Sequence, residues 1–84
     1  MEISRELRDI PVWVARRYLE SLPDSRGTRN GAEGPGWEAG IERLPDEPVG
    51  YLLFTRIRLS LRGDDAAVAA AWEELQPKFY RGGA

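Results

Sequence analysis

The chain contains no histidine and no cysteine. These absences remove the commonest general base, the thiolate nucleophile and the ligands of most zinc sites. They also exclude disulfide bonds, which many small domains need for stability. Only carboxylates, hydroxyls and arginines remain for chemistry, so we expect no catalytic residue, no cofactor and no metal. A small enzyme using Arg, Asp and Tyr is the minor alternative.

Long hydrophobic runs are also missing. No apolar segment approaches the ~20 residues that a membrane span requires, and the first residues lack the apolar stretch of a signal peptide. The net charge of -2 gives no general attraction to nucleic acid or to an anionic membrane. We therefore expect a soluble, cytoplasmic protein that does not bind membranes, and the charge disfavours nucleic-acid binding.

The size of the chain predicts one domain, 1–84, with a thin core. A domain of 84 residues buries only roughly 60–65% of the surface that its unfolded chain exposes. Trp13, Trp37 and Trp72 supply much of the apolar area, and we expect them to meet. Every basic residue except Lys78 is an arginine, which suits a protein of a thermophile or a GC-rich genome. A core this thin favours support from a protein partner or a homodimer.

The hydrophobic pattern predicts an α+β fold in the order β-α-β-β-α. A right-handed crossover and a hairpin give a three-stranded antiparallel sheet in the order 1-3-2, with two helices on one face. This is a truncated ferredoxin-like fold, and its first strand has a free edge. The expected strands are 2–9, 37–42 and 50–62, with turn chemistry at 45–48; the expected helices are 11–22 and 64–79.

The segment 23–36 contains four glycines and two prolines and almost nothing apolar. It predicts a long mobile loop. Its glycine-rich part has no Lys-Ser/Thr pair and follows a helix rather than a strand. It therefore fits neither a P-loop nor a dinucleotide-binding motif.

The third strand carries the clearest pattern in the chain. One face is apolar from Tyr51 to Leu61, apart from a threonine. The other face begins with Leu52 and Phe54, which are either an exposed interface or buried under the loop. The rest of this face is cationic. Its side chains either contact an anion or a partner, or form an ordinary solvated sheet face, and we favour the second interpretation. The cationic residues are Arg56, Arg58 and Arg62.

Three segments carry a resemblance: Gly34–Trp37, Tyr51–Gly63 and Ala71–Gly83. They are similar to a small domain family of thermophilic bacteria, found elsewhere fused after a ubiquitin-like sulfur-carrier domain. That carrier is of the kind found in the small subunit of molybdopterin synthase. The resemblance implies no active-site residues, and because the sequence starts at Met1 we expect this chain to lack the carrier domain.

The C-terminal Gly82-Gly83 is similar to the tail of such carriers. However, Ala84 follows it and a helix precedes it, so a glycine helix cap is the simpler interpretation.

Together these observations predict a non-enzymatic protein-interaction module, accessory to a sulfur-carrier or molybdopterin biosynthesis pathway. Leu52 and Phe54 are its candidate interface. The alternative is anion or nucleic-acid binding through Arg56, Arg58 and Arg62.

Overall fold

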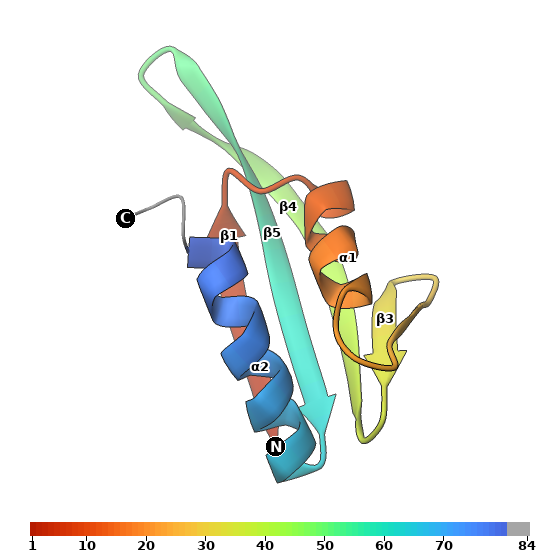
Figure 1. Cartoon of the computed structure of the whole chain (residues 1–84). Helices are drawn as coiled ribbons and strands as arrows, with labels where there is room; N and C mark the ends of the chain where they lie inside the picture. The colour runs from red at the N-terminus through yellow and green to blue at the C-terminus, as the bar shows by residue number, and fades with distance from the viewer. Residues whose placement is uncertain (81–84) are drawn as a thin grey trace.

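The computed structural model describes residues 1–80, so the expected cap at Gly82-Gly83 lies outside the described residues. Two helices cover one face of a five-stranded antiparallel sheet (Figure 1). The strands are β1 (Glu2–Arg8), β2 (Arg26–Gly27), β3 (Gly31–Gly34), β4 (Trp37–Val49) and β5 (Leu52–Gly63), and the helices are α1 (Val12–Glu20) and α2 (Asp65–Tyr80).

The strand order is β1-β5-β4-β3-β2. The predicted three-stranded, truncated ferredoxin-like sheet is therefore wrong. Its three long strands do lie in the expected order, as β1-β5-β4, but β3 and β2 extend the sheet beyond β4. The free edge of the sheet on that side belongs to β2.

The two missed strands lie in the glycine-rich segment, where close backbone approach replaces side-chain alternation. A Cβ on Gly31 would lie 2.2 Å from the carbonyl oxygen of Ala39 on β4, so only glycine fits there. The Arg16 guanidinium of α1 donates hydrogen bonds to the carbonyls of Thr28 (2.7 Å) and Arg29 (3.1 Å). Because backbone contacts hold this segment, its sequence lacks the alternation of apolar and polar side chains that would predict a strand. The mobility of 23–36 in solution stays a prediction.

The hydrophobic core lies between the sheet and the helices. The apolar stripe of α2 packs on β5, β1 and β4, and that of α1 packs on β4 and β3, as the 2.0 and 3.6 residue periods allow. Its largest fully buried side chains are Leu19, Ile57, Leu59, Leu61, Val68 and Leu75.

The three tryptophans do not meet, contrary to expectation. Trp37 is buried at the start of β4, whereas Trp72 is only half-buried at the margin of the core. The Arg5 guanidinium covers Trp72, with its carbon 5.4 Å from the ring centroid. Trp13 points outward from α1 and keeps 63% of its surface exposed.

The ends of the helices differ slightly from the prediction. Pro11 is the N-cap of α1 rather than its first residue, and α1 ends at Glu20. Asp9 adopts a positive φ of 65° and its N–H donates a 2.6 Å hydrogen bond to the Thr55 carbonyl. Helix α2 continues through Pro77 to Tyr80.

Candidate functional site

The β4–β5 hairpin projects far beyond the rest of the sheet (Figure 1). Pairing with β1 stops at Arg56, and pairing with β3 stops at Gly40. Beyond these points β4 and β5 pair only with each other, up to Val49 and Leu52. We call residues 45–55 the arm, and residues 49–53 its tip.

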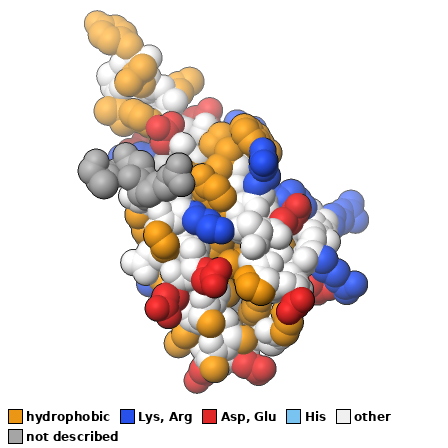
Figure 2. Space-filling model, in the orientation of Figure 1, with side chains coloured by type: hydrophobic (Ala, Val, Ile, Leu, Met, Phe, Trp, Pro, Cys, Tyr) orange, Lys and Arg blue, Asp and Glu red, His pale blue; other side chains and the backbone are white. Residues whose placement is uncertain are grey.

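The tip is apolar and open to solvent on both of its faces. Tyr51 is fully exposed, Leu53 keeps 70% of its surface exposed and Leu52 keeps 61%. Figure 2 shows hydrophobic side chains gathered at the end of this projection. Leu53 continues the inward face of β5, with Tyr51 just before the strand, and their exposure agrees with Figure 1, where the hairpin end extends beyond both helices.

The turn lies at Gly50-Tyr51, where Gly50 adopts a positive φ of 62°. A positive φ at the first central position suits a two-residue hairpin turn, and glycine adopts it without strain. The turn expected at 45–48 is wrong, because Pro45 and Pro48 lie within β4, beside a register shift between Leu44 and Glu47. Prolines and bulges discourage a further strand from joining this edge.

Ion pairs hold the base of the arm to the body of the domain. The Glu47 carboxylate lies 2.9 Å from the Arg8 guanidinium and 3.8 Å from that of Arg56. Arg56 also pairs with Glu6 on β1. These pairs link the base of the arm to β1, whereas within residues 1–80 none of the ion pairs involves the tip.

The predicted arginine site lies on the uncovered face of the sheet. Arg58 pairs with Glu42 at 3.1 Å, and Arg62 pairs with Glu38, each across the β4–β5 ladder. A ligand anion would have to displace these carboxylates. The arrangement favours the solvated-face interpretation of the arginines, and anion binding by them stays a prediction.

The candidate interface residues Leu52 and Phe54 differ in their surroundings. Leu52 belongs to the exposed tip, whereas Phe54 is half-buried opposite Glu47 near the base. The sequence reasoning missed the two inward-face residues of the tip, Tyr51 and Leu53. Their signal was an apolar run that begins directly after a glycine turn.

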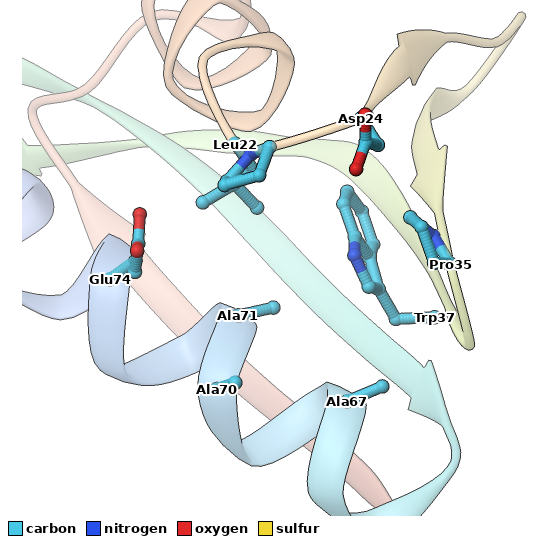
Figure 3. Close-up of a pocket in the computed structure, with 9 residues that line it drawn as sticks. Leu22, Asp24, Pro35, Trp37, Ala67, Ala70, Ala71 and Glu74 are labelled. Carbon is cyan, nitrogen blue, oxygen red and sulfur yellow. The ribbon is translucent and has the colours of Figure 1, made fainter.

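A second surface feature is a hollow between the end of α1, the start of β4 and α2 (Figure 3). It has a volume of about 230 Å³. Its walls are apolar and two carboxylates stand at its rim. We call it the Trp37 hollow; it is lined mainly by Leu22, Trp37, Ala67, Ala70, Asp24 and Glu74.

Two further observations bound the chemistry of residues 1–80. No group of three or more acidic side chains in this range gathers closely enough to hold a metal ion. Neither α1 nor α2 is long and apolar enough to cross a membrane.

The fold and surface define a small α+β domain that presents an apolar arm. A model of the archaeal MoaD-like protein family matches residues 3–84. The chain therefore belongs to that family, which confirms the predicted relation to MoaD-type proteins. No curated protein matches the chain. The thermophilic source and the fused carrier domain stay predictions.

Proposed function

We propose that this chain is a non-enzymatic protein-interaction module whose contact surface is the arm tip. The observation that supports this is the exposure of Tyr51, Leu52 and Leu53 together at the end of an arm that the core cannot cover. Contiguous exposed apolar patches mark interaction sites. Aromatic side chains such as Tyr51 are enriched at the centres of interfaces.

The proposed contact extends the predicted pair Leu52 and Phe54 toward the turn. Phe54 is half-buried near the base of the arm, while Leu52, Leu53 and Tyr51 present the apolar surface. A rigid base and a solvated tip suit a contact that is made by inserting the tip into a groove of another protein.

The proposed pathway is the sulfur-carrier step of molybdopterin biosynthesis. Membership of the archaeal MoaD-like family supports this assignment, as does the resemblance to a domain found after a sulfur carrier. The proposed partner is a sulfur-carrier protein on a separate chain. The alternative, anion binding by Arg58 and its neighbours, has less support because each of these arginines faces a carboxylate.

The test is a calorimetric titration of this chain with a purified molybdopterin-synthase sulfur-carrier subunit from the same organism. We expect binding, and we expect the double variant Tyr51→Ser, Leu53→Ser to weaken it at least about tenfold. Burying one leucine contributes about 1.5–3 kcal/mol, and about 1.4 kcal/mol corresponds to a factor of ten.

The matched control is Tyr80→Ser, which also removes an exposed tyrosine, but from the end of α2. It should leave the affinity unchanged. If the carrier does not bind at about 100 μM, the pathway assignment is wrong. If it binds and the tip variant binds equally well, the tip is not the contact surface.

A further inference from the structure

One stripe of α1 faces away from the core along its whole length. Trp13, Arg17 and Glu20 follow one another at helical spacing, and Asp24 lies in the turn that follows the helix, where its φ is 56°. All four are exposed, opposite the buried side of the helix. We call these four residues the α1 stripe.

The side chains of the stripe have few partners within the described part of the chain. Trp13 stands between two surface hollows, one beside Arg17 and Lys78 and the other beside Arg16 and Arg43. Among residues 1–80, no ion-pair partner within 4.0 Å is found for any charged member of the stripe. The arginines of the uncovered sheet face, by contrast, each have a carboxylate partner.

The Trp37 hollow opens at the other end of the same helix. Leu22 and Asp24, which directly follow α1, form one side of it, and Ala70 and Glu74 of α2 form the other (Figure 3). The stripe thus begins with a projecting indole that has cations beside it. It ends at an apolar hollow that has carboxylates beside it.

These two ends complement each other when two copies of the stripe lie antiparallel. With the midpoint between Arg17 and Glu20 shared, Arg17 faces Glu20 of the partner subunit, and Glu20 faces the partner's Arg17. Trp13 then lies over the partner's Asp24, at the rim of the partner's Trp37 hollow. At 1.5 Å per residue, Trp13 lies about 8 Å from that midpoint, which carries it past the partner's Glu20, the last residue of α1, to the turn that bears Asp24.

We infer that two copies of this chain associate through antiparallel α1 helices, each inserting Trp13 into the Trp37 hollow of the other. One surface patch carries the projecting Trp13, the Trp37 hollow and the oppositely charged Arg17 and Glu20. Such a patch is self-complementary, which is the requirement for a twofold dimer. A second copy therefore offers a carboxylate to Arg17, a guanidinium to Glu20 and a hollow to Trp13.

The dimer should be weak, because α1 has only nine residues and the interface is small. We expect a dissociation constant of about 10–100 μM. Trp13 is the anchor, since tryptophan and arginine dominate the energetics of interfaces. This interface is separate from the arm tip and does not depend on the proposed function.

The test is sedimentation velocity over about a hundredfold range of concentration around that value. Arg17→Glu alone and Glu20→Arg alone each place like charges opposite one another. Each should raise the dissociation constant at least about tenfold. The double variant Arg17→Glu, Glu20→Arg restores opposite charges and should return it to within about threefold of the parent value.

A matched control reverses an ion pair of the uncovered sheet face, with Arg58→Glu and Glu42→Arg together. This variant should dimerise like the parent. Trp13→Ala should be monomeric, and its melting temperature in dilute solution should equal the parent's, because Trp13 is outside the core.

A parent chain that stays monomeric at about 1 mM would overturn the inference. So would a double reversal no tighter than the single reversals. If Tyr51→Ser, Leu53→Ser abolishes the dimer while Trp13→Ala keeps it, self-association belongs to the arm and the inference is wrong.

Discussion

Leu53 and Leu59 are the same residue type on the same face of the same strand, yet their surroundings are opposite. Leu59 keeps 1% of its surface exposed and Leu53 keeps 70%. Leu59 belongs to the part of β5 that lies under α2, whereas the hairpin end of β5, which carries Leu53, extends beyond both helices (Figure 1). The alternation of apolar residues therefore marks a face of the strand, while burial depends on what lies over that face.

This contrast separates two uses of one strand. The covered half of β5 holds the domain together, and the uncovered half is available for contact with another molecule. A leucine in the covered half stabilises the fold. A leucine in the uncovered half contributes free energy only when a partner is bound.

The largest expected effect comes from breaking the covered half. Leu59→Ala should lower the free energy of unfolding by about 2–5 kcal/mol, because it leaves a cavity in a thin core. Leu53→Ala, the matched exposed variant, should change it by no more than about 0.5 kcal/mol. Urea denaturation of the two variants measures this. Equal losses would mean that the arm tip is buried in solution.

An intermediate effect is expected where β3 meets β4. Gly31→Ala should cost about 1–3 kcal/mol, because the added methyl group would clash with the backbone of Ala39. Gly40 is directly opposite in register, and a Cβ there meets nothing within 4 Å. Gly40→Ala should therefore be neutral or slightly stabilising. Thermal denaturation compares the two, and similar melting temperatures would argue against a docked β3.

The smallest effect is expected on the uncovered face of the sheet. Arg58 and Glu42 form an exposed pair, so their coupling energy should be below about 1 kcal/mol. It should shrink further in about 1 M salt. A double-mutant cycle with Arg58→Ala and Glu42→Ala gives the value. A coupling well above that limit would mean that the open face contributes as much to stability as the covered half.

Much of the fold could be predicted from the alternation in β5 and the apolar stripes of the helices, because those elements bury side chains at regular spacing. Strands β2 and β3 could not, because Gly27, Gly31 and Gly34 contribute backbone rather than side chains. Arg16 stabilises that segment from a distant helix, which no local pattern reveals. Pro45 and Pro48 indicated a turn, but the partner strand accommodates them with a register shift.

The candidate site was predicted in part. The sequence indicates Leu52 because it stands with Phe54 at the apolar start of a strand face that then becomes cationic. The sequence places Tyr51 and Leu53 on the apolar face of the strand, and only the structure shows that no helix covers that face at the tip. The sequence also does not predict that Trp13 is exposed, since a tryptophan in a helix of a small domain is ordinarily a core residue.

The position of β5 between β4 and β1 also has a consequence for the order of folding. Its pairing with β4 closes at the short turn between Val49 and Leu52, whereas its pairing with β1 brings Glu2 against Arg62. The first contact is local and needs little loop closure, and the second encloses most of the chain. The hairpin is therefore expected to form early, and the closing of β1 onto it to limit the folding rate.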